Sequence, residues 1–175
     1  ASASIAFPAM AEACNAVRTI AQAALFPANC RLLDATEALM NGVGQTPTLV
    51  LGFESADHAV DAWLARGLEI CREHGGSVAA GPAREADASD GDAAATWRSA
   101  FLRMPYFRNF LTPLGVIADT FETAITWERF EDFHRGVFER VGRAIRETCG
   151  HAPVMSCRFT HVYPDGPAPY FTFYA

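Results

Sequence analysis

The sequence contains no run of lysine or arginine, and its formal net charge is −6 with a pI near 5.3. Proteins that bind nucleic acid or anionic membranes do so through clustered basic side chains. These two classes of partner are therefore not expected. No stretch approaches the roughly eighteen apolar residues of a membrane span, and residues 1–4 (Ala-Ser-Ala-Ser) lack the charged and apolar regions of a signal peptide.

Several motifs of enzyme active sites are also missing. There is no G-x-G-x-x-G following a strand, no P-loop lysine motif and no G-x-S-x-G turn, so the chain encodes neither a phosphate cradle nor a serine nucleophile. Any nucleotide cofactor would be held chiefly by residues outside this chain. No pair of histidines has the spacing of metal ligands, and no metal site is expected.

The cysteines show neither a C-x-x-C spacing nor an even number, which disfavours a disulfide framework. The five are Cys14, Cys30, Cys71, Cys149 and Cys157. Unpaired cysteine commonly behaves as a small buried hydrophobe, and we expect buried free thiols here. Free thiols persist in reducing compartments, so the expected location is cytoplasmic.

The chain has 175 residues, of which 50% are hydrophobic and 19% charged, as in an ordinary globular domain. Its hydrophobic periodicity alternates between strand and helix patterns, with Pro8 and Thr126 at expected helix starts and Ser55 or Asp57 as a cap. Strands are expected at Ser2–Phe7, Arg31–Asp34, Thr46–Phe53, Ser77–Ala80 and Leu114–Thr123, and two more in Pro153–Ala175 around the turn Pro164-Asp165-Gly166. Helices are expected at Met10–Leu25, Thr36–Met40, Val60–Cys71, Ala95–Arg103 and Trp127–Cys149, and a polar loop at Pro82–Ala95.

This order predicts a ferredoxin-like α+β fold, a single domain (residues 1–175) with a mostly antiparallel sheet and helices on one face. In the longest helix, Phe130, Phe133, Val137, Val141 and Ile145 should face the sheet. The chain stops in mid-strand, so we expect it to be part of a longer protein. In such a part, the uncovered face should expose an apolar and aromatic patch, whereas in a free-standing module it should be polar.

Tyr170 lies in the aromatic run Pro169–Tyr174, on a strand that should pair with the one carrying Arg158. A phenol normally has a pKa near ~10 and can act as a base when neighbouring cations favour the phenolate. Arg158 or Arg108 could supply that charge. The alternative is a packing residue with its hydroxyl at the rim of the core.

Arg108 is a further candidate for catalysis, and Arg31, Arg158, Glu122 and His161 are candidates for binding substrate or cofactor. Arg108 lies in an apolar stretch where an unpaired guanidinium would be costly to bury, so it must meet an anion: a carboxylate such as Asp119 or Glu122, or a substrate phosphate or carboxylate. Arg31 could bind the same kind of group or pair with Asp34. Glu122 and His161 alternate with apolar neighbours and should share one face of the sheet, either a pocket or the helix-covered core.

Several segments resemble one enzyme family along nearly the whole chain. They are Phe7-Pro8, Arg31–Asp34, Gly75-Gly76, Tyr106–Arg108, Asp119–Ala124, Trp127–Arg129, Ser156–Tyr163 and Tyr170–Phe173. In this pattern the sequence resembles the C-terminal, substrate-side domain of FAD-linked oxidases of the vanillyl-alcohol oxidase superfamily, closest to the alkylglycerone-phosphate synthases.

The resemblance implies an FAD enzyme whose cofactor is bound mainly by a separate N-terminal domain, while this domain caps the isoalloxazine ring. Such enzymes exchange the acyl chain of an acyl-dihydroxyacetone phosphate for a fatty alcohol, through an adduct at flavin N5. The family's catalytic tyrosine falls on Tyr170, its active-site arginine on Arg108 and a second arginine on Arg31. A histidine-rich segment would follow Ala175, and without it and the FAD-binding domain the chain alone should be inactive.

The expected partners follow from the same resemblance. They are a small-molecule substrate, which could be a lipid phosphate, and the protein's own FAD-binding domain. Peripheral membrane contact of the full-length enzyme and a homodimer are further candidates.

Two alternatives stay open. One is a related FAD-dependent oxidoreductase acting on a 2-hydroxy acid or an aryl alcohol, where an arginine would bind a carboxylate. The other is a free-standing ferredoxin-like module that binds a ligand. The proline pair Pro167 and Pro169 before Tyr170 and the polar loop at residues 81–92 depart from the family's pattern and bear on the choice of substrate.

Overall fold

The computed structural model describes residues 1–78 and 108–175. Within these ranges seven strands form one antiparallel sheet in the order β4-β1-β3-β2-β6-β7-β5. The α+β fold with an antiparallel sheet is confirmed. The expected helix Ala95–Arg103 and the loop Pro82–Ala95 lie outside the described residues.

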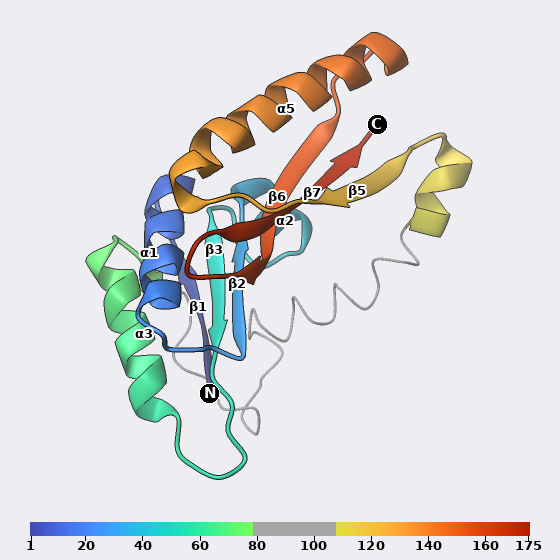
Figure 1. Ribbon diagram of the computed structural model, residues 1–175. Helices are drawn as coiled ribbons and strands as arrows, with labels where there is room; N and C mark the ends of the chain where they lie inside the picture. The colour runs from blue at the N-terminus through green and yellow to red at the C-terminus, as the bar shows by residue number, and fades with distance from the viewer. Residues whose placement is uncertain (79–107) are drawn as a thin grey trace.

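The first half of the chain forms a complete ferredoxin-like unit, with strands in the order β4-β1-β3-β2. Its elements are β1 (Ser2–Ala6), α1 (Met10–Gln22), β2 (Asn29–Leu33), α2 (Ala35–Met40), β3 (Thr48–Gly52), α3 (Asp61–Glu73) and β4 (Ser77–Val78). Helix α1 connects β1 to β2 and helix α3 connects β3 to β4, each crossing over one strand of the sheet, and the two helices lie together on one side of it (Figure 1).

The second half extends this sheet by three strands. Its elements are η2 (Thr112–Leu114), β5 (Ala118–Glu122), α5 (Trp127–Cys149), β6 (Val154–Val162) and β7 (Pro167–Tyr174). The two halves meet where Leu33 of β2 pairs with Arg158 of β6 and where the Asp34 N–H donates to the Cys157 carbonyl at 2.9 Å. The sheet is therefore continuous across the junction.

The main core lies between the sheet and the helices α1, α3 and α5. Its fully buried members include Ile5, Val17, Ile20, Leu49 and Phe159. The alternation of strand side chains puts Ile5, Leu49 and Phe159 on the face that α1 covers with Val17 and Ile20, and leaves a second face with mainly polar side chains. We call this second face the polar face; it carries Arg31, Thr48, Ser156, Arg158, His161, Tyr170, Thr172, Thr120 and Glu122.

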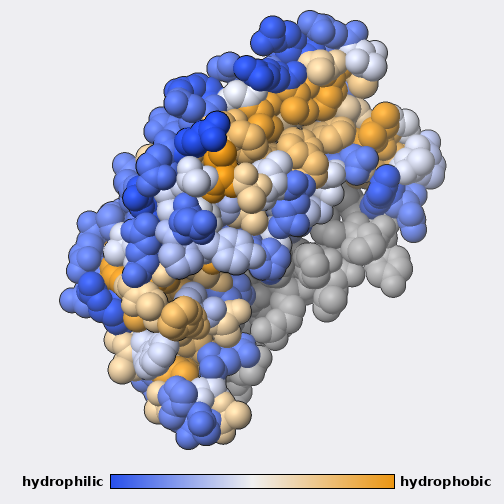
Figure 2. Space-filling view, in the orientation of Figure 1, coloured by the Kyte–Doolittle hydropathy of each residue, from blue (hydrophilic) through white to orange (hydrophobic). Residues whose placement is uncertain are grey.

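Helix α5 is only partly covered by the core. Phe130 is buried against Phe159, as expected, but Val137 and Val141 are half-buried and line a groove of about 540 Å³ beside Ile125. Apolar side chains accordingly appear at the surface along α5 in Figure 2. The helix extends past the part of the sheet that α1 also covers, so the far end of its apolar stripe has little core to contact.

Several element boundaries differ from expectation. The expected strand Leu114–Thr123 is shortened to β5, because Gly115, with φ of 77°, ends the turn η2 just before it. Helix α1 begins after Pro8 and ends at Gln22. Helix α3 starts after Val60 without a side-chain cap, because Ser55 and Asp57 hydrogen-bond to each other instead.

Thr126 occupies the N-cap position of α5, again without a side-chain hydrogen bond. The hairpin between β6 and β7 supplies the contacts there: the Asp165 carbonyl accepts from the Trp127 N–H, and the Trp127 indole N–H donates to the Pro164 carbonyl at 3.1 Å. Among the described residues, no helix has the length and apolar character needed to cross a bilayer.

Gly166 in this hairpin has no room for a side chain. A Cβ at that position would lie 1.9 Å from the Ile125 carbonyl oxygen, which belongs to rigid backbone. We expect Gly166→Ala to lower the free energy of unfolding by about 2 kcal/mol or more, because the hairpin must move away from the start of α5. Urea denaturation measures this, with Gly136→Ala, where a Cβ would meet no atom within 4 Å, as the control. Equal effects at both positions would contradict the prediction.

Candidate functional site

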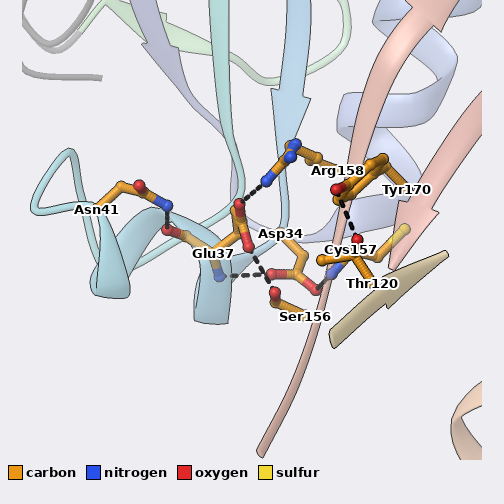
Figure 3. Close-up of polar contacts among 8 residues, drawn as sticks. All are labelled: Asp34, Glu37, Asn41, Thr120, Ser156, Cys157, Arg158 and Tyr170. Carbon is orange, nitrogen blue, oxygen red and sulfur yellow. Dashed lines mark hydrogen bonds and ion pairs between the residues drawn. The ribbon is translucent and has the colours of Figure 1, made fainter. Parts of the chain in front are cut away.

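Tyr170 lies at the centre of the polar face, between its neighbours on β6 and β5. Its register partners are Arg158 on one side and Glu122 on the other. The Arg158 guanidinium carbon lies 4.0 Å from the centre of the Tyr170 ring, a cation–π contact. The Tyr170 hydroxyl donates to Thr120 Oγ1 at 2.7 Å (Figure 3). The phenol is therefore directed along the polar face, away from the layer of α1, α3 and α5.

Arg158 is held from its other side by a buried carboxylate. Glu37 of α2 forms an ion pair with it, with 2.6 Å between a carboxylate oxygen and a guanidinium nitrogen. The Glu37 side chain is only 2% exposed and that of Arg158 only 10% exposed. Ser156, two residues earlier on β6, donates its hydroxyl to the second oxygen of Glu37 at 2.5 Å. Both oxygens of this carboxylate thus have a partner, as a buried charge requires.

Asp34 attaches the start of α2 to β6. One of its oxygens caps the helix by accepting from the Glu37 N–H at 2.7 Å, and the other accepts from the Cys157 N–H at 2.6 Å. Burial raises the pKa of Asp34 to about 6, and these hydrogen bonds partly oppose that increase. The folded protein therefore binds a proton at Asp34 more tightly than the unfolded chain does.

This shift predicts a pH dependence of stability. Because the pKa of Asp34 is about 6 when folded and near 3.8 when unfolded, the free energy of unfolding should fall as the pH rises from about 4 to about 6. The Asp34→Asn variant lacks this fall, so its stability deficit relative to the unsubstituted chain should shrink between pH 4 and pH 7 by on the order of 2 kcal/mol. Urea denaturation at both pH values measures the change, with Glu139→Gln on the surface of α5 as control. A deficit that is constant with pH would be inconsistent with this assignment.

Arg31 lies on the same face, one strand away on β2. Burial lowers the pKa of its guanidinium, and the positive charge of Arg158 lowers it further. Two cationic groups thus approach each other on the polar face. Such a pair favours the binding of an anionic group such as a phosphate or a carboxylate.

Glu122 and His161 share the polar face, as the alternation predicts. The His161 Nδ1 and a Glu122 oxygen are 3.6 Å apart, and both side chains are largely exposed. Of the two expected environments, the helix-covered core is therefore excluded. Tyr174 also lies on this face, and its pKa is raised first by burial and then by the charge of Glu37.

Arg108 is placed differently from the other candidates. It is exposed in a short helical stretch, residues 108–111, and its carbonyl accepts from the Thr112 hydroxyl at 3.0 Å. Within residues 1–78 and 108–175, no hydrogen bond or ion pair connects its guanidinium to Asp119, Glu122 or Tyr170. An exposed guanidinium is solvated by water, so the requirement for an anionic partner that burial would impose does not arise. Its catalytic role stays a prediction.

Sequence reasoning missed Glu37, Ser156 and Thr120. Glu37 stands three residues after Asp34, a spacing that marks a helix start, but a glutamate on a short helix is usually exposed. Its burial depends on β6, 119 residues away. The hydrogen bond between Thr120 and Tyr170 could not be predicted without knowing the register between β5 and β7.

The polarity of this face contradicts one expectation. In the described part of the chain it carries hydroxyl and charged groups, not the apolar and aromatic patch expected of part of a longer protein. This face contains one buried ion pair, Arg158 with Glu37, and a hydrogen bond between Tyr170 and Thr120, and polar groups of this kind suit contact with a polar ligand.

Three of the cysteines are buried free thiols, as expected: Cys14, Cys71 and Cys157. Burial raises the pKa of Cys14 and Cys71 to about 12. A thiol with such a pKa is not a nucleophile near neutral pH. Cys30 is half-buried and Cys149 exposed, both also unpaired.

A family model for the C-terminal domain of FAD linked oxidases matches residues 1–175. The chain belongs to this family. The expected resemblance is thereby confirmed at the level of the family, along the full length of the sequence.

Two solved structures of alkyldihydroxyacetonephosphate synthase, from two crystal forms, share the fold of this FAD-linked oxidase domain. One matches with a TM-score of 0.82 and the other with 0.78, each at 17% identity and over 99% of this chain. The chain spans 35% and 36% of those two proteins, about a third of their length. At this identity the likeness shows a common fold.

Proposed function

We propose that this domain forms the substrate side of an FAD-dependent enzyme resembling alkyldihydroxyacetonephosphate synthase. In that role the polar face lies toward the substrate, and a separate domain of the same protein binds most of the FAD. The substrate would be an acyl-dihydroxyacetone phosphate whose acyl chain is exchanged for a fatty alcohol.

The observation that carries this proposal is the placement of five predicted site residues on one face. Arg31, Glu122, Arg158, His161 and Tyr170 come from four different strands, and the polar face brings them together on the side opposite α1, α3 and α5. The group of phenol, carboxylate, imidazole and guanidinium is suited to proton transfer beside a bound anion.

The residues present fit a flavin substrate site of this kind. Arg31 would supply positive charge for a phosphate, beside Arg158, whose own charge is largely balanced by Glu37. The Tyr170 hydroxyl donates to Thr120, so a proton can pass between the two hydroxyls. Bound FAD supplies the electron-accepting ring. Tyr170 would remove the proton from the substrate carbon beside the ketone, and Glu122 with His161 would contact the polar end of the substrate.

A second function uses the same groups. An FAD-dependent oxidoreductase acting on a 2-hydroxy acid would bind its carboxylate through the two guanidinium groups, and their approach to each other on one face favours this alternative as well. An aryl alcohol carries no anionic group and would make less use of Arg31 and Arg158.

The two functions differ in what happens to the flavin. The full-length protein is mixed without oxygen with lactate as a simple 2-hydroxy acid, and the absorption of the flavin is followed. For the synthase, the flavin should keep its oxidised spectrum with lactate, whereas palmitoyl-dihydroxyacetone phosphate and hexadecanol should yield the ether product. Bleaching by lactate would eliminate the exchange reaction, and failure of both assays would favour a module that only binds a ligand.

A further inference from the structure

Glu37 is the most completely buried carboxylate in the described parts of the chain, with 1% of its surface exposed. It belongs to α2, a six-residue helix on the polar face. Figure 3 shows its carboxylate pointing toward β6, where it meets Arg158 and Ser156, while its backbone carbonyl accepts from Asn41 at 2.8 Å. Glu37 is therefore fixed by contacts on both its side chain and its backbone.

These contacts restrict Arg158. A free arginine side chain samples many rotamers, whereas here one guanidinium nitrogen is held 2.6 Å from Glu37 and the guanidinium lies over the Tyr170 ring. The Tyr170 ring is thus confined between Arg158 and the hydrogen bond to Thr120. Removing the Glu37 charge would free the arginine that contacts the ring.

We propose that Glu37 is a positioning residue for Tyr170: through Arg158 it fixes the ring, and its negative charge offsets the positive charge of Arg158 beside the phenol. The contacts among Glu37, Arg158 and Tyr170 are given by the structure, and the expected effect on turnover rests on the proposed function. It also changes the expected role of Arg158, because a guanidinium paired with a buried carboxylate gives the phenol much less cationic stabilisation than a free one.

Two neighbouring groups show that this charge pair acts on the surrounding face. The charge of Glu37 contributes to the raised pKa of Tyr174, after burial, and the charge of Arg158 contributes to the lowered pKa of Arg31, also after burial. In residues 1–78 and 108–175, the ionisable groups that face Tyr170 and its neighbours are Arg31, Asp34, Glu37, Glu122, Arg158, His161 and Tyr174.

The test uses the full-length protein with its flavin and the Glu37→Gln variant. Tyrosine labelled with ¹³C on the ring reports the surroundings and the mobility of each tyrosine ring by NMR, and the Tyr170→Phe variant identifies the Tyr170 signals. Because Glu37→Gln releases Arg158 from its ion pair, the Tyr170 ring signals should shift and the ring should flip faster than in the unsubstituted protein. Turnover should fall at least about tenfold with flavin still bound, because the ring is less well oriented.

Glu139→Gln removes an exposed carboxylate from α5 and should change neither quantity. Unchanged Tyr170 ring signals in Glu37→Gln would overturn the proposal, as would unchanged turnover. The NMR result stands apart from the function: full activity of Tyr170→Phe would reject the proposed role of Tyr170, while the ring signals would still report whether Glu37 holds the ring in place through Arg158.

Glu37→Gln leaves the Arg158 charge buried without a counter-ion and could prevent folding. In that case the double variant Glu37→Leu with Arg158→Met decides, because apolar residues of similar volume often replace a buried ion pair without loss of stability. A positioning role predicts a stable, flavin-loaded protein with at least about tenfold lower turnover. Turnover at the level of the unsubstituted protein would reduce Glu37 to a structural role and overturn the proposal.

Discussion

Tyr170→Phe in the full-length enzyme is expected to lower kcat by at least about two orders of magnitude while the flavin stays bound. The substitution removes the hydroxyl that is proposed to take the proton from the substrate. A fall in kcat of this size is usual when an enzyme loses its general base. Phenylalanine keeps the ring against Arg158, and the contact at 4.0 Å involves the ring rather than the hydroxyl. Packing of the polar face should therefore change little.

Steady-state turnover and the flavin absorption spectrum measure the two parts of this result. Tyr163→Phe is the matched control, because Tyr163 is 52% exposed on the β6–β7 hairpin, away from the Arg158 contact. Turnover of Tyr170→Phe equal to that of the control would remove Tyr170 from the mechanism. Loss of flavin in Tyr170→Phe would instead assign it a role in cofactor binding.

Arg158→Met should lower the free energy of unfolding by about 3–5 kcal/mol, because it leaves the Glu37 carboxylate buried without its cation. Ser156 would still donate one hydrogen bond to Glu37, which is not enough to offset a buried negative charge. The variant should therefore unfold at lower urea concentration than the unsubstituted chain.

The Glu37→Leu and Arg158→Met double variant tests the cause of that loss. If the unpaired charge is responsible, stability should return to within about 1 kcal/mol of the unsubstituted chain. Arg66→Met, which breaks exposed ion pairs with Glu69 and Glu73, is the control and should cost much less stability than Arg158→Met, because water screens an exposed pair. A similar small loss for Arg158→Met would show that water reaches Glu37.

Thr120 completes the description of the phenol. In the structure the Thr120 hydroxyl oxygen accepts a hydrogen bond from the Tyr170 hydroxyl, with 2.7 Å between the two oxygens. If Tyr170 acts as a phenolate, the Thr120 hydroxyl has to rotate and donate to it, which a hydroxyl can do without moving the backbone. Thr120 thus provides a hydrogen-bond partner for both protonation states.

Much of the fold could be predicted because its signals are local. The spacing of apolar residues in α1 and α5, the turn at Pro164-Asp165-Gly166 and the order of elements all lie within short stretches of sequence. Boundaries were less accurate, as at β5, because a left-handed residue such as Gly115 ends a turn where the propensities would continue a strand. Phe133 faces the sheet as predicted, with its ring 6.1 Å from that of Phe171, but Phe133 and Val137 are only half-buried because little core lies beneath that part of α5.

The site could be predicted in part. Period-two alternation put Glu122, His161, Tyr170 and Tyr174 on matching sides of their strands, but it could not say which side faces the helices. That was decided by the packing of Phe159 and Phe130 on the opposite face. For Arg108 the sequence misled: its apolar neighbours in the sequence suggested burial, whereas the residue is exposed.

Residue identity and short-range spacing were enough to predict the element order, the family, the chemical types present on the strands and the pairing of the strands that carry Arg158 and Tyr170. Only the folded chain showed that Glu37 is buried against Arg158, since that contact joins residues 121 positions apart. The physical reason is desolvation: the ionic partners of a buried group are set by what surrounds it in three dimensions, and pairing between β2, β6 and β7 creates those surroundings.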